Sequence, residues 1–250
     1  MAFVTAERRE EIALVTLNRP RGNAFTPELV AELRQAVLES RQARGLVLAS
    51  ALPKIFSGGW DLPDLTARPF EEFETFVNAY CDLIREVFVY GGPVIAALNG
   101  HAVAGGLILA AAADERIAAD SDAVFGLSEV ALGVPLPRPL LEIFRHALGA
   151  RGMERLAASG ENLSVASAQA IGLIDRVVPA GEVLDRAVER ARQLASNSPE
   201  AHAEIKRRAR SDAISRFDES RRGDPFLGFW QSPGAQARIQ ALVERLTRSR

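Results

Sequence analysis

Two short apolar segments constrain the fold of this 250-residue chain more than any other feature. Residues 45–49 read GLVLA and residues 93–98 read PVIAAL, so neither shows the alternation of a strand with one solvated face. Uninterrupted runs of this length are typical of strands that helices bury on both faces. We therefore expect an α/β fold, with about the first 190 residues forming its core.

Capping residues and spacing place further elements. Thr26 is a favourable N-cap and Pro27 a favourable first helical residue, so we expect a helix from there to about Ser40. From about Ala187 onward the sequence shows only helical patterns. The remaining expected elements are a long amphipathic helix over residues 70–90 and strands over residues 3–8, 12–17, 116–118, 124–126 and 175–178.

Composition excludes several classes of function. Hydrophobic residues make up 48% and charged residues 25% of the chain, and the net charge of −2 gives no basic field for nucleic acid or anionic membranes. Cys81 is the only cysteine, which excludes a disulfide within one chain and a cysteine-rich metal site. The longest apolar run, residues 102–113, is shorter than the roughly 20 residues of a membrane helix. We expect a cytoplasmic protein.

The stretch HAVAGGLILAAAAD, residues 101–114, follows the second apolar run. Gly100 and Gly105 have the spacing of a phosphate-binding loop, but Gly106 stands where that motif requires lysine, so nucleotide hydrolysis is excluded. What remains is a turn and a helix that starts near Gly105, where unpaired backbone N–H groups are available to a ligand. The alternative is that these glycines only let the helix and the strand pack closely.

Two further segments give this turn a chemical context. Residues 54–62 read KIFSGGWDL, in which a second small-residue turn follows a buried strand and Asp61 suits a helix start. Two such turns can each aim one N–H at the same oxygen, which would form an oxyanion hole. Glu129 is a lone acid in the stretch FGLSEVALG, residues 125–133, and burial would make it a stronger base. Two unrelated turns and an exposed loop glutamate are the alternatives.

Together these segments resemble the crotonase superfamily, the enoyl-CoA hydratase/isomerase family. The resemblance implies a spiral of ββα units over residues 1–190 and a C-terminal helical region over residues 191–250 that closes the site and forms trimer contacts. It also implies an acyl-CoA substrate, no metal, no cofactor besides the coenzyme A of that substrate, and trimers or dimers of trimers. The matching stretches are LNRP at 17–20, FSGGWDL at 56–62, PVIAALNGHAVAGG at 93–106, FGLSEVALG at 125–133 and AIGLIDRVVP at 170–179.

The resemblance also assigns roles to single positions. The backbone N–H groups of Ser57 and Gly105 would form the oxyanion hole for the thioester oxygen, and Glu129 would be the catalytic acid/base. The residues expected to bind substrate are Asn23, Ala24, Phe25, Lys54, Phe56, Gly58, Gly59, Trp60, Gly106 and Ile108.

One departure from the family pattern separates the candidate activities. Hydratases of the family carry their first glutamate in a Gly-Gly-Gly-x-Glu pattern, whereas residues 104–108 here read AGGLI and end in Ile108. The second glutamate is present as Glu129. One carboxylate beside an oxyanion hole can move a proton within a substrate, and an apolar residue at 108 would exclude water. The pattern resembles the 3,2-enoyl-CoA isomerase branch of the family.

Several alternatives stay open. A CoA-thioester hydrolase, a decarboxylase or a weak enoyl-CoA hydratase of the same superfamily would use the same oxyanion hole. More distant alternatives are a non-catalytic crotonase-fold protein and an RNA-binding protein. The RNA-binding alternative depends on basic residues that more often form a solvated helix face, namely Lys206, Arg207, Arg208, Arg210, Arg221 and Arg222.

Large aromatic residues near the expected site have two interpretations each. Trp60 either narrows the acyl pocket or packs against the following helix. A late cluster lines either the acyl tunnel or a subunit contact, and consists of Phe226, Phe229 and Trp230.

Overall fold

The computed structural model describes residues 2–248, and its strands form two sheets. The larger sheet has the order β1-β2-β3-β5-β7-β10, in which only the β1–β2 pair is antiparallel. Its strands are β1 (Val4–Arg9), β2 (Ile12–Leu17), β3 (Gly45–Ser50), β5 (Val94–Leu98), β7 (Glu115–Asp120) and β10 (Arg176–Pro179). The smaller sheet has the order β4-β6-β8-β9, with β4 (Lys54–Ser57), β6 (Gly100–Val103), β8 (Val124–Gly126) and β9 (Asn162–Ser164).

The chain alternates between the two sheets. β3 of the larger sheet leads into β4 of the smaller sheet, β5 leads into β6, and β7 leads into β8. β4, β6 and β8 are neighbours and run parallel, so their carboxyl ends meet at one edge of the smaller sheet. Loops at the carboxyl ends of adjacent parallel strands are where α/β proteins commonly bind ligands.

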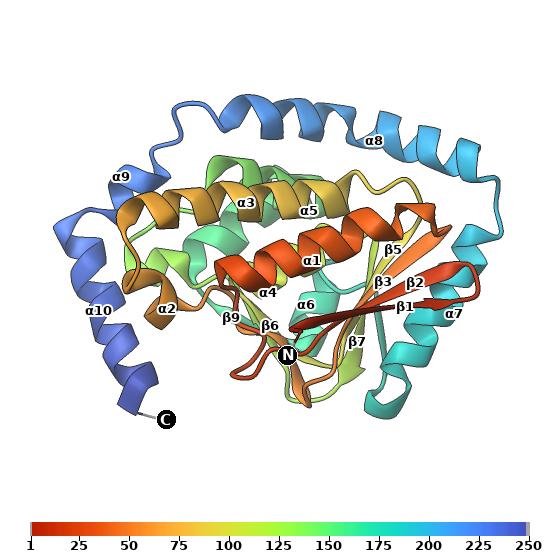
Figure 1. Ribbon diagram of the computed structural model, residues 1–250, viewed down its shortest axis with the longest axis horizontal. Helices are drawn as coiled ribbons and strands as arrows, with labels where there is room; N and C mark the ends of the chain where they lie inside the picture. The colour runs from red at the N-terminus through yellow and green to blue at the C-terminus, as the bar shows by residue number, and fades with distance from the viewer. Residues whose placement is uncertain (1, 249–250) are drawn as a thin grey trace.

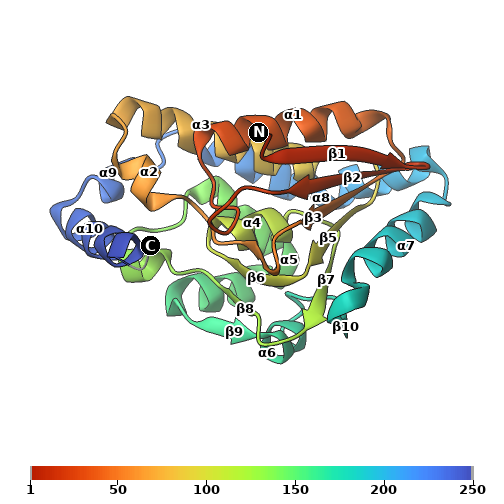
Figure 2. The same cartoon turned by 60° about the horizontal axis from the view of Figure 1, so that its bottom comes forward.

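Helices bury the larger sheet on both faces, as its uninterrupted apolar strands predict. Ile12, Val47 and Ile95 pack with α7 (Val183–Ala195) on one face, whereas Val15 and Leu48 belong to the main core on the other. Figure 1 and Figure 2 show α7 at one end of the molecule and α9 and α10 at the opposite end. The remaining helices are α1 (Pro27–Glu39), α2 (Leu62–Thr66), α3 (Phe70–Phe88), α4 (Gly105–Ala111), α5 (Arg138–Ser159), α6 (Val165–Ala170), α8 (Pro199–Ser220), α9 (Phe226–Trp230) and α10 (Pro233–Arg248), with short turns η1 (Ser40–Gln42), η2 (Glu129–Leu132) and η3 (Ala180–Glu182).

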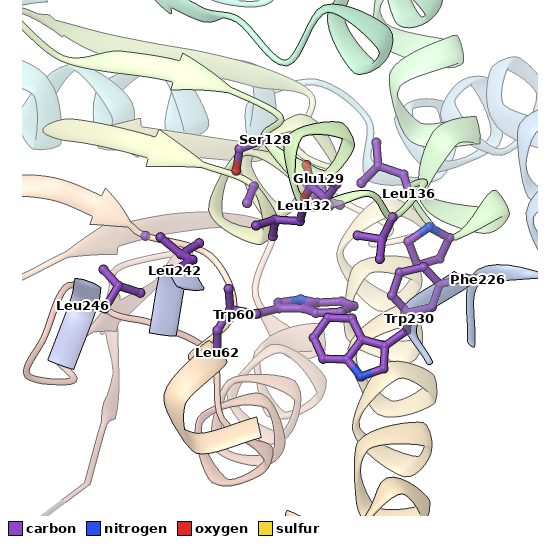
Figure 3. A pocket seen from close by; sticks show the side chains of 15 residues that line it. Trp60, Leu62, Ser128, Glu129, Leu132, Leu136, Phe226, Trp230, Leu242 and Leu246 are labelled. Carbon is purple, nitrogen blue, oxygen red and sulfur yellow. The ribbon is translucent and has the colours of Figure 1, made fainter. Parts of the chain in front are cut away.

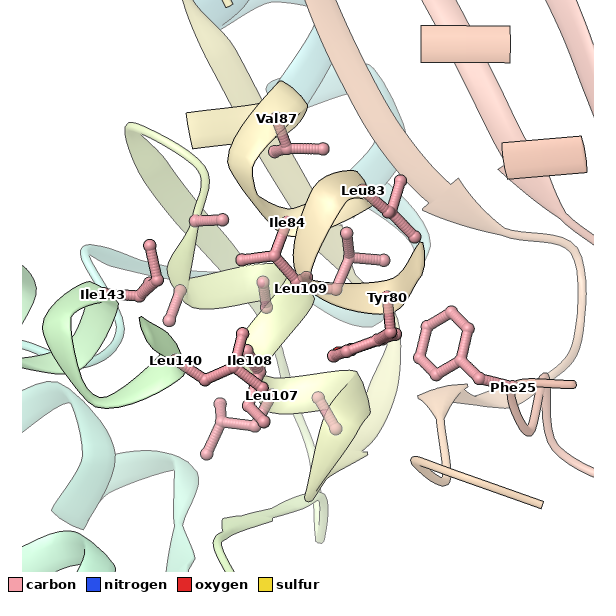
Figure 4. Packing of buried hydrophobic residues seen from close by; sticks show 14 of the residues in the cluster. Phe25, Tyr80, Leu83, Ile84, Val87, Leu107, Ile108, Leu109, Leu140 and Ile143 are labelled. Carbon is pink, nitrogen blue, oxygen red and sulfur yellow. The ribbon is translucent and has the colours of Figure 1, made fainter. Parts of the chain in front are cut away.

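Helix α4 lies in the middle of the main core. All seven of its residues are buried, and it packs between α3 and α5. Figure 4 shows Leu107, Ile108 and Leu109 of α4 among side chains of α3 and α5, with Tyr80 of α3 reaching toward Phe25. The helix that opens with Gly105 is therefore held rigidly from several sides.

Most expected elements are confirmed, including the helix capped by Thr26, whose hydroxyl accepts a hydrogen bond from the Leu29 N–H. Two turns were expected where the structure has the short strands β4 and β6, which come soon after β3 and β5. These strands have only four residues each and contain Gly100 and Ser57, so the sequence shows no periodic pattern there. The division at residue 190 stays a prediction, and Met1, Ser249 and Arg250 lie outside the described residues.

The basic run on α8 is only partly a solvated face. Lys206 Nζ and Arg210 are both buried and bind the carboxylate of Asp114, each at 2.7 Å. Asp114 also accepts the Val94 N–H at 2.7 Å, so its carboxylate joins α8 to the end of α4 and to β5. Arg207, in contrast, pairs with Glu204 at the surface. Two of the cations that motivated an RNA-binding alternative are thus inside the protein.

We predict that Asp114→Asn lowers the free energy of unfolding by roughly 3–5 kcal/mol, because it leaves two buried cations without their counter-charge. The measurement is urea-induced unfolding followed by far-UV circular dichroism. Glu204→Gln is the matched control, since it removes an exposed partner of Arg207 on the same helix and should leave the midpoint unchanged. Equal effects of the two substitutions would contradict this account of α8.

No helix in residues 2–248 is long and apolar enough to cross a membrane.

Candidate active site

Three segments that are far apart in sequence meet at the edge of the smaller sheet. Gly58, Gly59 and Trp60 follow β4, Gly105 follows β6 after one intervening residue, and Glu129 follows β8 after two intervening residues. The parallel pairing of β4 with β6 and of β6 with β8 brings these segments together. The sequence predicted a functional role for all three segments, and the fold places them around one cavity.

Two backbone N–H groups lie free beside each other at this edge. The Phe25 N–H donates to the Gly59 carbonyl and the Asp61 N–H donates to the Phe25 carbonyl, which leaves the Trp60 N–H between them without an acceptor in the described chain. Gly105 is the first residue of α4, so no preceding helical turn supplies an acceptor for its N–H. A Cβ placed on Gly59 would lie 3.1 Å from the Gly105 nitrogen, which shows how closely the two loops approach.

The start of α4 is strained and tightly packed. Ala104, immediately before the helix, has φ 48° and ψ −126°, a conformation that residues with a Cβ rarely adopt. A Cβ on Gly106 would lie only 2.3 Å from the Ser57 carbonyl oxygen, so the first turn of α4 rests directly on the end of β4. Only glycine permits that approach. The turn at Ala104 therefore directs the N-terminus of α4 against the β4 loop.

Two aromatic side chains hold Gly105 in place. The Tyr80 hydroxyl donates a hydrogen bond to the Gly105 carbonyl at 2.5 Å, and Tyr80 is completely buried. The edge of the Trp60 indole covers the Gly105 Cα, because a Cβ there would lie 2.8 Å from Trp60 Cδ1. The rings of Tyr80 and Trp60 meet edge to face, with centroids 5.5 Å apart. Gly105, whose N–H is free, thus has little room to move.

A cavity of about 200 Å³ opens beside these N–H groups. Figure 3 shows the rings of Trp60, Phe226 and Trp230 at one end, Leu242 of α10 toward the other, and Glu129 along one side. The cavity is lined by Gly58, Trp60, Leu62, Ala104, Ile108, Ser128, Glu129, Leu132, Val134, Leu136, Pro137, Phe226, Trp230, Leu242 and Leu246. Apart from the Ser128 hydroxyl and the indole N–H groups of Trp60 and Trp230, the Glu129 carboxylate is the only polar side-chain group among these residues.

The Glu129 carboxylate is poorly solvated. Its Oε2 is buried and has no hydrogen-bond partner in the described part of the chain. Desolvation raises the pKa of Glu129 from 4.5 to about 7, and a hydrogen bond from a backbone N–H lowers it by less. A carboxylate with a pKa near 7 in an apolar cavity is well matched to general acid/base chemistry near neutral pH.

The predicted site residues divide into two groups. Glu129, Gly58, Trp60 and Ile108 line the cavity. Several others are buried parts of the scaffold: the Asn23 side chain binds Ser50 and the Phe56 carbonyl, Phe25 packs against Tyr80, and Gly59 and Gly106 allow the close approaches described above. Ala24 is half-buried, and Lys54 is exposed in a left-handed conformation with φ 59°.

The resemblance gave the Ser57 backbone N–H the role of an oxyanion-hole donor, but Ser57 is not among the residues that line the cavity. It is completely buried within β4, and its hydroxyl donates to the Asn23 carbonyl and accepts from the Gly59 N–H. The free N–H of this loop belongs to Trp60, three residues further on. Sequence reasoning also missed Tyr80, because a tyrosine on the apolar stripe of an amphipathic helix looks like any other core residue.

Comparison with known proteins identifies the family of this chain. Residues 7–240 match the family model for enoyl-CoA hydratase/isomerase. The chain belongs to this family. It is 36% identical over 189 residues to the mitochondrial enoyl-CoA hydratase domain-containing protein 2 of Bos taurus, which covers 74% of this chain but only 63% of that protein. It is 33% identical over 217 residues to the carnitinyl-CoA dehydratase of Escherichia coli O157:H7, covering 85% and 82% of the two chains.

The fold also matches a solved structure over its full length. The crystal structure of human mitochondrial delta3-delta2-enoyl-CoA isomerase superimposes with a TM-score of 0.94 at 27% identity, covering 100% of both chains. The predicted α/β crotonase fold with C-terminal helices is confirmed, and the protein is an acyl-CoA-processing enzyme of this family. The names of these relatives include a hydratase, a dehydratase and an isomerase, so family membership alone does not identify the reaction of this chain. The trimeric assembly and the cytoplasmic location stay predictions.

The environment of Glu129 predicts a pH-dependent cost to stability. Because its pKa is higher in the folded than in the unfolded state, folding is unaffected by this group below about pH 4. As pH rises from 4.5 to about 7, the unfolded chain loses this proton first, so the free energy of unfolding falls. Glu129→Gln, which stays neutral, should be as stable as the wild type at pH 4 and roughly 2–3 kcal/mol more stable at pH 8.

Chemical denaturation of both proteins at the two pH values measures this difference. All other titrating groups are common to the pair, so their contributions cancel. A variant that is equally stable or less stable than the wild type at pH 8 would show that Glu129 ionises without a desolvation cost.

Proposed function

We propose that this enzyme is a 3,2-enoyl-CoA isomerase, which moves a double bond from the β,γ to the α,β position of an acyl-CoA. The observation that carries the proposal is that Glu129 is the only carboxylate among the described residues that line the cavity, while Ile108 occupies the position where a hydratase of this family has its first glutamate. The named activity of the human structural relative supports the same choice.

The reaction follows from one carboxylate and two N–H groups. The thioester oxygen accepts hydrogen bonds from the Trp60 and Gly105 N–H groups. The Glu129 carboxylate removes a proton from Cα, and the electrons form a dienolate whose negative charge rests on that oxygen. The protonated Glu129 then returns the proton to Cγ, which leaves the double bond between Cα and Cβ. Because both transfers use Glu129, the proposed reaction requires no cofactor beyond the coenzyme A of the substrate.

In this proposal Trp60 replaces Ser57 as the second donor of the oxyanion hole. The reason is geometric, because the Trp60 N–H lacks an acceptor and adjoins the cavity, whereas Ser57 is enclosed within β4. An oxyanion hole of preorganised N–H groups stabilises charge that develops only during the reaction, and one donor is typically worth about 100- to 1,000-fold in rate.

Ile108 completes the proposal by keeping the cavity apolar. Its side chain is almost completely buried in α4 and lines the same cavity as Glu129. Hydration needs a water molecule held and activated beside the double bond, and an isoleucine offers that water no hydrogen bond. Proton transfer within one substrate needs no such water, so exclusion of water favours isomerisation over hydration.

We expect Glu129→Gln to lower kcat/KM for a 3-enoyl-CoA by roughly 10²- to 10⁴-fold while the affinity for a saturated acyl-CoA is retained. In the wild type, activity should rise with pH through an ionisation near 7 and then level off, because the base must be deprotonated. The assay follows formation of the 2-enoyl thioester, with identification of all products by mass. Full activity of the variant would exclude Glu129 as the base.

Product identity tests the choice among reactions. The wild type should hydrate crotonyl-CoA very slowly, and it should release no free coenzyme A from acyl thioesters. Efficient hydration would contradict the role given to Ile108, and release of coenzyme A would favour a thioester hydrolase instead.

A further prediction concerns Tyr80 as a positioning residue. Tyr80→Phe removes the hydrogen bond to the Gly105 carbonyl, so kcat should fall about 10- to 100-fold with little change in KM. Tyr90→Phe is the matched control, because the buried Tyr90 hydroxyl donates to the Ser40 carbonyl at 2.6 Å, away from the cavity. An equal loss of kcat in the two variants, together with a similar loss of stability, would show that Tyr80 has only a structural role.

A further inference from the structure

We infer that the acyl cavity is a closed chamber for short or compact acyl groups, and that Phe226 of α9 is the residue that sets its length. This inference rests on the proposed function only in its first experiment, which measures the isomerisation of 3-enoyl-CoA substrates. The chamber has a volume of about 200 Å³, which is below the roughly 300–1,000 Å³ of sites for drug-sized ligands. A long linear acyl chain would therefore have to leave the chamber, and buried side chains separate the chamber from both neighbouring cavities.

The end of the chamber is an aromatic wall formed by Trp60, Phe226 and Trp230 (Figure 3). Trp60 meets Phe226 edge to face with ring centroids 5.9 Å apart, and Phe226 lies 6.2 Å from Trp230. Trp230 stacks on Phe73 of α3 with centroids 4.1 Å apart. Phe226, Trp230 and Phe73 are only 2%, 6% and 2% exposed, so none can turn aside without disrupting packed side chains.

Behind this wall lies a second cavity of about 200 Å³ that shares only Phe226 and Pro137 with the chamber. Its other lining residues are mixed: Val77, Pro139 and Leu227 are apolar, whereas Glu74, Arg221 and Asp224 are charged. Phe226 is therefore a partition between the acyl chamber and a cavity that has an apolar part of its own. Shortening this one side chain would join the two spaces.

A larger groove of about 620 Å³ lies on another side of the chamber and shares Glu129, Val134 and Leu136 with it. Val134 and Leu136 are 3% and 5% exposed and separate the two spaces. Phe229 of α9 lines this groove and is 49% exposed, although it is only three residues from Phe226. Two phenylalanines of one short helix thus border two different candidate routes for an acyl chain.

The first experiment compares chain lengths in the wild type. A six-carbon 3-enoyl-CoA should be isomerised with a kcat/KM at least ~100-fold above that of a twelve-carbon 3-enoyl-CoA, because several methylenes find no room. Equal turnover of both chains would overturn the inference and leave the proposed function intact. Absence of turnover with either chain would contradict the proposed function and leave the chamber to the binding test below.

The binding test needs no catalysis. Isothermal titration with saturated hexanoyl-CoA and dodecanoyl-CoA should show clear binding of the first and at least ~100-fold weaker binding of the second. Similar affinities for the two thioesters would overturn the closed chamber whatever reaction the enzyme performs.

The decisive variants are Phe226→Ala and its matched control Phe229→Ala. Phe226→Ala should raise the affinity for dodecanoyl-CoA toward that for hexanoyl-CoA, whereas Phe229→Ala should leave the chain-length ratio unchanged. A change confined to Phe229→Ala would place the acyl chain in the groove past Glu129 and overturn the role of Phe226. Thermal unfolding checks both proteins, and Phe226→Leu, a smaller truncation, replaces Phe226→Ala if the latter does not fold.

Discussion

Backbone pairing between β4, β6 and β8 places the ends of three distant chain segments on one edge of a small sheet. The free N–H groups of Trp60 and Gly105 and the carboxylate of Glu129 all depend on that pairing, because each follows one of these strands within three residues. Strand pairing fixes the register to one residue, and a slip would turn every side chain to the other face. The site is therefore as rigid as the sheet that carries it.

The surrounding fold compensates for local costs at this edge. Ala104 is strained, and Glu129 Oε2 is buried without a partner. Such features persist where the neighbouring structure over-determines them. Here α4 is enclosed by α3 and α5, its first turn rests on β4, and the Asp114 carboxylate beyond its last turn binds two cations of α8. The buried ion cluster and the active-site strain thus lie at opposite ends of one short helix.

The sequence predicted much of this arrangement from apolar runs, capping residues and glycine-rich turns. Glu129 could be singled out because a lone acid in an apolar stretch is unusual, and Ile108 because a motif position is visibly changed. The Trp60 N–H could not be singled out in this way, because spacing does not reveal which of the consecutive N–H groups between Ser57 and Trp60 lacks an acceptor. Lys206 and Arg210 look like their exposed neighbour Arg207 in sequence, since only the tertiary position of Asp114 distinguishes them.

The aromatic wall and Ile108 have one physical effect in common. Both place apolar groups around Glu129, and desolvation raises its pKa to about 7. Near neutral pH the carboxylate can therefore accept a proton and the carboxylic acid can donate one. A single group that alternates between these states can carry a proton from Cα to Cγ only if water does not exchange that proton first. Small volume, apolar lining and a lone carboxylate are therefore linked properties, and enlarging the chamber at Phe226 would admit longer chains together with water.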